Sequence, residues 1–151
     1  MPLSENSVAP SFSLLDETGK EHKLSDYLGQ SLVLYFYPKD DTPGCTTEAC
    51  EFRDDYKEYE KAGVKILGIS PDSVKSHAKF KAKYELPFTI LADEDHQVCE
   101  AYGVWGLKEM MGREYNGVFR TTFLIGPDGK VKKVFENVKP KGHSQEVLAA
   151  L

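Results

Sequence analysis

The chain has 151 residues, of which 40% are hydrophobic and 28% charged, and a formal net charge of −5. This length can bury one hydrophobic core, so we expect a single domain over residues 1–151. The acidic balance argues against nucleic acid or an anionic membrane as the partner. No apolar run is long enough to cross a bilayer.

Three cysteines are too few and odd in number for a secreted disulfide framework, and the N-terminus shows no signal-peptide pattern. We therefore expect a reducing, cytoplasmic location, where a nearby cysteine pair is usually catalytic or metal-binding. The four histidines are scattered, and none stands at ligand spacing from the cysteines, so we expect no metal.

In chain order, residues 12–15 and 21–24 flank a glycine-containing turn and predict a hairpin. Ser25 is expected to cap a short helical turn that ends at Gly29. Residues 31–37 form a nearly continuous apolar run, typical of a central strand covered on both faces. A helix of about 15 to 18 residues should follow, and then a second buried strand over 64–69. The remaining predicted elements are a helix from residue 73 to 84, strand 88–91, helix 96–102, a long loop over 103–117, a hairpin of strands 118–125 and 131–137, and a last helix over 144–151.

Helices and strands alternate early in this order, and a hairpin comes late. A crossover helix joins parallel strands, whereas a hairpin joins antiparallel ones. The sequence therefore predicts an α/β fold with a mixed central sheet and helices on both faces.

Cys45 is predicted to lie in the first turn of the helix that follows strand 31–37. Thr42 suits the N-cap position and Pro43 the first helical position. Unpaired N–H groups and the positive end of the helix dipole meet in this turn, and they favour a reactive thiolate. The alternative is an inert cysteine of the core.

The helical period places apolar residues on the sheet-facing side and acidic residues mostly on the solvated side. The first set is Cys45, Ala49, Phe52, Tyr56 and Tyr59, and the second is Glu48, Glu51, Asp54, Asp55 and Glu58. Cys45 is therefore expected to point inward.

Cys50 follows Cys45 by five residues. In an intact helix their Cα atoms would be about 8 to 9 Å apart, beyond the limit of about 7 Å for a disulfide. If the two cysteines are a redox pair, the start of the helix must unwind in each cycle. Two unrelated cysteines in one helix remain the alternative.

Arg120 interrupts the otherwise apolar strand predicted over 118–125. A buried guanidinium needs an anionic partner, and Glu48 and the Cys45 thiolate are the candidates. The alternative is an edge strand with Arg120 in water. Arg113 in the predicted loop competes for the same role.

These residues together resemble a peroxiredoxin of the bacterioferritin comigratory protein (Q-type) subfamily. The motif consists of a proline, a threonine four residues later and a cysteine three residues after that, here Pro38, Thr42 and Cys45. The string around Cys45, with the second cysteine at +5, is similar to the subfamily's own variant, and residues 112–125 resemble the strand that carries the family's distal arginine.

The resemblance implies a thioredoxin-like fold and the reduction of hydrogen peroxide and organic hydroperoxides. It matches Cys45 to the peroxidatic cysteine and Cys50 to the resolving cysteine. The resemblance further implies that Thr42 and Arg120 bind the peroxide oxygens, that Glu48 orients the arginine, and that Pro38 shields the thiolate. Cys99 matches no required position.

No cofactor is implied, and the expected reductant is thioredoxin, or glutaredoxin. An intramolecular resolving cysteine makes a monomer the default. One rival is a general disulfide oxidoreductase, although such enzymes usually use Cys-x-x-Cys. Another is a redox sensor or holdase switched by the same pair. Trp105, Met110 and Met111 form a hypothetical apolar rim that would favour organic hydroperoxides.

Overall fold

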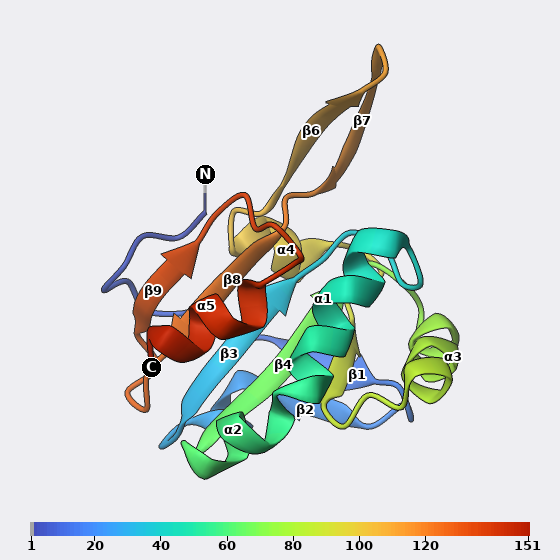
Figure 1. Cartoon of the computed structure of the whole chain (residues 1–151). Helices are drawn as coiled ribbons and strands as arrows, with labels where there is room; N and C mark the ends of the chain where they lie inside the picture. The colour runs from blue at the N-terminus through green and yellow to red at the C-terminus, as the bar shows by residue number, and fades with distance from the viewer. Residues whose placement is uncertain (1) are drawn as a thin grey trace.

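A computed structural model describes residues 2–151, which form a seven-stranded mixed sheet in the order β2-β1-β5-β4-β3-β8-β9 (Figure 1). β3 pairs in parallel with β4 and β4 with β5, whereas the other neighbours are antiparallel. The strands are β1 Ser13–Asp16, β2 Glu21–Lys23, β3 Ser31–Phe36, β4 Val64–Ser70, β5 Thr89–Ala92, β8 Thr121–Ile125 and β9 Val131–Phe135. The predicted mixed sheet is confirmed.

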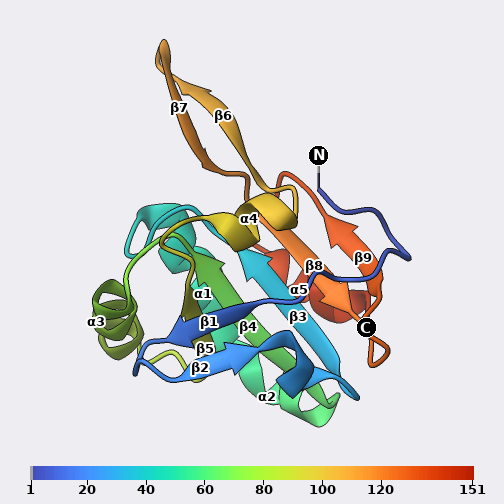
Figure 2. The ribbon, with the colours of Figure 1, turned by 180° about the vertical axis from the view of Figure 1, so that it is seen from behind.

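Helices cover both faces of this sheet (Figures 1 and 2). Side chains of α1 (Pro43–Asp54), α2 (Tyr56–Lys61), α3 (Val74–Tyr84) and α5 (His143–Ala149) belong to the apolar cluster on one face. The short α4 (Gln97–Ala101) packs into the cluster on the other face. No helix within residues 2–151 has both the length and the hydropathy needed to cross a membrane.

β3 lies inside the sheet, and its side chains divide between the two clusters. Leu32, Leu34 and Phe36 belong to one cluster, whereas Val33 and Tyr35 belong to the other. This alternation follows from the twofold period of a strand. It explains the continuous apolar run, because both faces of β3 are buried.

Two helical details differ from the predictions. The single helix expected after β3 is divided at Asp55 into α1 and α2. The early helical turn η1 (Leu24–Tyr27) has Lys23, and not Ser25, at its N-cap position. Both differences concern element ends, which hydrophobic period defines poorly.

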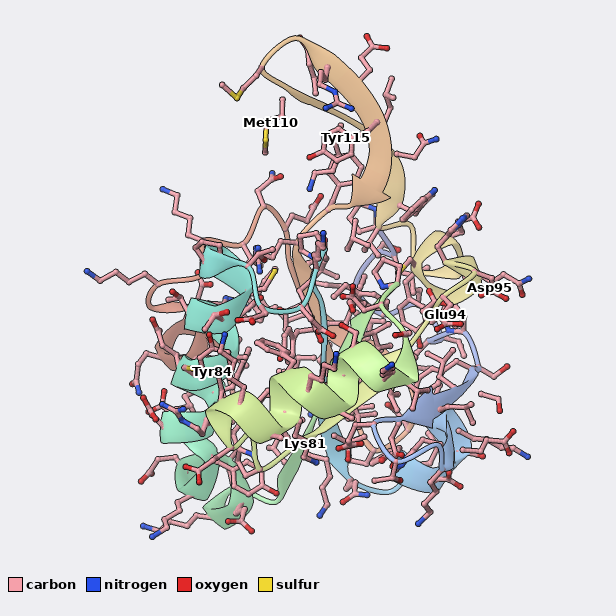
Figure 3. The ribbon with its side chains drawn as sticks, turned by 90° about the vertical axis from the view of Figure 1, so that its right-hand side faces the viewer. Lys81, Tyr84, Glu94, Asp95, Met110 and Tyr115 are labelled. Carbon is pink, nitrogen blue, oxygen red and sulfur yellow. The ribbon has the colours of Figure 1, made fainter. Side chains whose placement is uncertain are left out.

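The long loop predicted over residues 103–117 is wrong. This segment is a hairpin of β6 (Trp105–Met110) and β7 (Arg113–Val118), which pair with each other and project from the body of the protein (Figures 1 and 3). Met111 and Gly112 turn the chain with positive φ angles of 53° and 80°. Apart from its base, where Val118 is buried, the projecting hairpin has no buried face, so its strands lack the alternation that would have identified them.

The strand predicted over 118–125 also needs correction. β7 ends at Val118 and β8 begins at Thr121, so Phe119 and Arg120 lie between two strands of different sheets. The Phe119 N–H donates to the Val104 carbonyl at 2.7 Å. Arg120 therefore stands in the connection between the two sheets, outside both strands, and its side chain is free of the strand alternation.

Gly68 of β4 provides a test of packing beneath α1. A Cβ atom at this position would lie 2.9 Å from Tyr35 Cζ, and Tyr35 is itself stacked on Phe52 with ring centroids 4.8 Å apart. We expect Gly68→Ala to lower the free energy of unfolding by about 1–3 kcal/mol in urea titrations. Gly126→Ala is the matched control, because its Cβ would meet the flexible end of Lys132. Equal midpoints for both variants would contradict this packing argument.

Candidate active site

A short segment, residues 37–42, leads from the carboxyl end of β3 to α1, which presents Cys45 in its first turn. Thr42 is at the N-cap position, Pro43 is the first helical residue, and the Thr46 N–H donates to the Thr42 carbonyl at 2.8 Å. The Thr42 side chain makes no cap hydrogen bond, because its Oγ1 donates to the Lys39 carbonyl at 2.8 Å. The inward direction predicted for Cys45 is confirmed, since only 1% of the residue is exposed.

Arg120 contacts both residues that the sequence named as its candidate partners. Its Nη2 donates to Cys45 Sγ at 3.2 Å, and its Nη1 donates to Glu48 Oε1 at 2.7 Å. The water-facing alternative for Arg120 is therefore excluded. The competing Arg113 begins β7 at the exposed far end of the hairpin, paired with Met110.

Glu48 lies on the buried side of α1, which corrects its placement among the solvated acidic residues. It is 1% exposed, and within the described residues its second oxygen, Oε2, has no hydrogen-bond partner. Burial raises the pKa of Glu48 to about 7, although Arg120 opposes that rise. Burial would lower the pKa of Arg120, but the neighbouring Glu48 and Cys45 raise it overall. The Arg120 guanidinium thus interacts with both Glu48 and Cys45.

Gly44 and the segment after β9 complete the surroundings of the guanidinium. A Cβ atom on Gly44 would lie 3.2 Å from Arg120 Nη2 and 3.3 Å from Pro140 Cγ. The Val138 N–H donates to the Arg120 carbonyl at 3.1 Å. Glycine at position 44 therefore allows the arginine and the proline to approach the helix start.

The three cysteines have different environments, and all three are free thiols. Cys50 shares the intact α1 with Cys45 and is half-buried, and burial raises its pKa. Cys99 of α4 is fully buried, and burial together with the nearby Asp93 carboxylate raises its pKa. Among the described residues, Cys45 is the cysteine whose sulfur accepts a hydrogen bond from a guanidinium.

The other predicted residues are distributed unevenly. Pro38 follows β3 and is half-buried. The proposed apolar rim is not assembled, because Trp105 pairs with Val118 at the base of the hairpin and Met110 pairs with Arg113 at its tip (Figure 3). Trp105 instead stacks on His96, with ring centroids 4.0 Å apart.

Sequence reasoning missed a buried polar group beside the site. Asp40 lies between β3 and α1, and its side chain binds Tyr37 and His77 at 2.6 and 2.7 Å. The sequence carried no signal for it, since an aspartate in a loop before a helix is usually solvated. Lys108 was also missed; its Nζ donates to the Val118 carbonyl at 2.9 Å, and burial and then Arg120 lower its pKa.

The chain is similar to known proteins of one family. Residues 6–134 match the model of the AhpC/TSA family. The chain is 51% identical over 151 residues to a putative peroxiredoxin bcp of Coxiella burnetii, and the match covers 100% of both chains. It is 50% identical over 147 residues to the peroxiredoxin Bcp of Escherichia coli K12, and that match covers 97% of this chain and 94% of the relative. The chain is a peroxiredoxin.

Solved structures agree with this family and with the thioredoxin-like fold. The bacterioferritin comigratory protein of Xanthomonas campestris, studied for its alkyl peroxide reduction activity, is 45% identical with a TM-score of 0.87, covering 92% of this chain and 88% of that one. A PrxQ mutant of Xylella fastidiosa is 38% identical with a TM-score of 0.89, covering 98% and 96%. This peroxiredoxin is therefore a thiol-dependent peroxidase, with a peroxide as substrate and a thiol as reductant.

The buried Glu48 gives the peroxiredoxin a pH-dependent stability. Its pKa rises from 4.5 to about 7 on folding, so between these values the folded state holds a proton that the unfolded chain has released. This contribution is present at low pH and is lost as the pH rises through 7. Relative to Glu48→Gln, the wild type should lose up to about 3 kcal/mol of unfolding free energy over that interval.

Urea titrations of the reduced proteins across this pH range provide the measurement. Glu58→Gln is the control, because Glu58 is an exposed carboxylate of α2. Parallel stability profiles for the wild type and Glu48→Gln would show that Glu48 does not titrate in this interval.

Proposed function

We propose that this peroxiredoxin reduces hydrogen peroxide and organic hydroperoxides with Cys45 as the peroxidatic cysteine. The observation that carries the proposal is the contact of the Arg120 guanidinium with both Cys45 Sγ and Glu48 at the start of α1. A cation beside a thiol at a helix N-terminus favours the thiolate, which is the nucleophilic form. The alkyl peroxide reduction activity named for the Xanthomonas relative supports the inclusion of organic hydroperoxides.

In the first step, the Cys45 thiolate attacks one peroxide oxygen and the O–O bond breaks. Sulfur becomes a sulfenic acid, and the other oxygen takes up a proton and leaves as water or an alcohol. Arg120 and the N–H groups of the first turn of α1 stabilise the charge that moves along this bond. Thr42 Oγ1 already donates to Lys39, so it can accept a hydrogen bond from the peroxide. We assign Pro38 the role of shielding the thiolate.

In the second step, the Cys50 thiol gives up its proton and its sulfur attacks the sulfenic sulfur; the S–O bond breaks, a disulfide forms, and the leaving hydroxide takes up a proton to become water. The wound α1 keeps the two cysteines too far apart, so its start must unwind. An external dithiol, thioredoxin or glutaredoxin, then reduces the disulfide by exchange. The intramolecular bond requires no second subunit, so we propose a monomer that works in the reducing cytoplasm.

Cysteine substitutions test these assignments. Cys45→Ser should abolish peroxide consumption, and Cys50→Ser should allow one turnover without recycling, because only the resolving thiol is lost. Cys99→Ser should keep full steady-state activity, since Cys99 is fully buried and has a raised pKa. The assay couples peroxide consumption to thioredoxin and its reductase, and peptide mapping identifies the joined sulfurs.

Two outcomes would contradict the assignments. Full steady-state activity of Cys50→Ser would show that resolution uses another thiol. A single stoichiometric oxidation of the wild type without turnover would favour a redox sensor or holdase.

Arginine substitutions test the origin of reactivity. Arg120→Lys keeps the charge but loses the planar fork that reaches Cys45 and Glu48 together. We expect the second-order rate constant for Cys45 oxidation to fall by about 10²–10³-fold, as for loss of one transition-state donor. Arg113→Lys is the matched control and should keep the wild-type rate, because Arg113 is exposed on the hairpin. Rapid-mixing, single-turnover measurements give both rates, and equal rates would exclude Arg120 from the reaction.

A further inference from the structure

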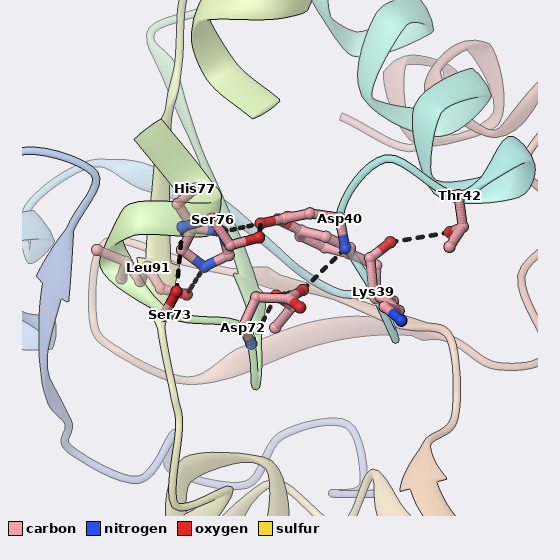
Figure 4. A network of polar contacts seen from close by, with 10 residues as sticks. Lys39, Asp40, Thr42, Asp72, Ser73, Ser76, His77 and Leu91 are labelled. Atoms are coloured by element: carbon pink, nitrogen blue, oxygen red, sulfur yellow. Dashed lines mark hydrogen bonds and ion pairs between the residues drawn. The ribbon is translucent and has the colours of Figure 1, made fainter. Parts of the chain in front are cut away.

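A second buried polar cluster lies beside α1, and we call it the Asp40 network: Tyr37, Asp40, Ser76 and His77. Figure 4 shows Asp40 with Ser76 and His77. Asp40 Oδ1 accepts the Tyr37 hydroxyl at 2.6 Å. Asp40 Oδ2 accepts from the Ser76 hydroxyl at 2.8 Å and lies 2.7 Å from His77 Nδ1. The side chains of His77 and Asp40 are 0% and 3% exposed. Such a buried group is costly unless all its polar atoms are paired.

The hydrogen bonds show where the protons of this network are. His77 Nε2 lies 2.9 Å from the Leu91 carbonyl, which can only accept, so Nε2 carries a hydrogen. His77 Nδ1 faces Asp40, which accepts from two hydroxyls and is an acceptor when ionised. A proton therefore lies between His77 and Asp40, and the pair is a neutral unit in the core. Loss of this proton would leave a lone pair on His77 Nδ1 facing the Asp40 carboxylate.

The backbone of Asp40 is held as well. Its N–H donates to Asp72 Oδ2 at 2.8 Å, and the Ser70 hydroxyl donates to the same oxygen at 2.6 Å. Asp40, Asp72 and His77 are close enough together to suggest a metal site. However, both nitrogens of His77 and the nearest carboxylate oxygens already have hydrogen-bond partners. We therefore interpret the cluster as a hydrogen-bonded support.

The support acts on the segment that enters α1. Asp40 lies five residues before Cys45, and the adjacent Lys39 carbonyl accepts from Thr42 Oγ1. The next residue, Asp41, has a positive φ of 56° and binds Lys83 and Tyr84 of α3 at 2.8 and 2.7 Å. Residues 39–42 are thus fixed along α3 at two points. Because the exposed Asp41 contacts contribute little, the buried Asp40 network is the stronger of the two.

We propose that Asp40 and His77 are positioning residues that hold α1 wound, and so set the balance between peroxide reduction and disulfide formation. The inference rests on the proposed function, because it requires Cys45 to meet Cys50 by unwinding of α1. Release of the Asp40 network frees residues 39–42 and the first turn of α1. The network therefore stabilises the conformation in which Arg120 reaches Cys45.

The size of the effect depends on the populations of the wound and unwound conformations of α1. Removing a hydrogen bond to a buried charged group should raise the population of the unwound conformation about tenfold. If the wound conformation is dominant, that change hardly alters its own population, so the rate of Cys45 oxidation stays nearly constant. Disulfide formation scales with the minor, unwound population, so its rate should rise about tenfold.

The test compares these two rates in Ser76→Ala, Asp40→Ala and Asp40→Asn. Rapid mixing with hydrogen peroxide gives the rate of Cys45 oxidation, and acid quench with peptide mapping gives the rate of Cys45–Cys50 bond formation. Ser76→Ala and Asp40→Ala should form the disulfide about tenfold faster and accumulate less sulfinic acid at high peroxide. Asp40→Asn should remain closer to the wild type, because its amide can donate to a neutral His77 Nδ1.

Ser73→Ala is the matched control. The Ser73 hydroxyl caps α3 by accepting from the Ser76 N–H at 3.0 Å, so its loss destabilises the same helix without touching Asp40. An equal acceleration in Ser73→Ala, or an unchanged rate in Ser76→Ala, would overturn the positioning role. Failure of the wild type to form the Cys45–Cys50 disulfide would instead refute the proposed function. If Asp40→Ala does not fold, Ser76→Ala decides the question, since Ser76 is only partly buried.

Discussion

The site depends on one guanidinium that two acidic groups share. Arg120 is 72 residues from Glu48 and 75 from Cys45 in the chain, yet it binds both at 2.7 and 3.2 Å. Cys45 and Glu48 are three residues apart on α1, so both face the arginine only while the helix is wound. Folding of the sheet brings Arg120 to the helix start, and the local helix brings the two acidic groups to Arg120. Neither contribution alone produces the site.

The contacts of Arg120 leave this arrangement incompletely stabilised. A fully satisfied ion pair would keep the pKa of Glu48 low, whereas burial raises that pKa to about 7 and Oε2 lacks a partner within the described residues. The guanidinium is therefore shared between two groups that compete for it. Cys99 illustrates the opposite environment, because its thiol is buried without a cation and its pKa is raised. We therefore propose that electrostatic neighbours make Cys45 reactive and leave Cys99 inert.

The sequence revealed the parts of the molecule that local rules govern. The apolar run of β3 and the Thr42-Pro43 start of α1 predicted the strand, the helix and the inward direction of Cys45. Glu48 was misplaced because its burial depends on a partner 72 residues away, which helical period cannot include. The β6–β7 hairpin was missed because it lacks a buried face, although glycine at position 112 suits its turn. Asp40 and His77 were missed because their pairing is entirely tertiary.

A peroxiredoxin with both cysteines in one helix has conflicting structural requirements. In the proposed mechanism, attack on peroxide needs α1 wound, because Arg120 contacts Cys45 in that conformation, whereas disulfide formation needs the same turns unwound. When α1 unwinds, the contact between Arg120 and Cys45 is lost and the first turn becomes a flexible segment. The contact energy therefore cannot be made arbitrarily large without trapping Cys45 as sulfenic acid. Interactions outside the reacting groups, such as those of Asp40, can adjust this balance without altering the chemistry at sulfur, and the position of Asp40 just before α1 is suited to that task.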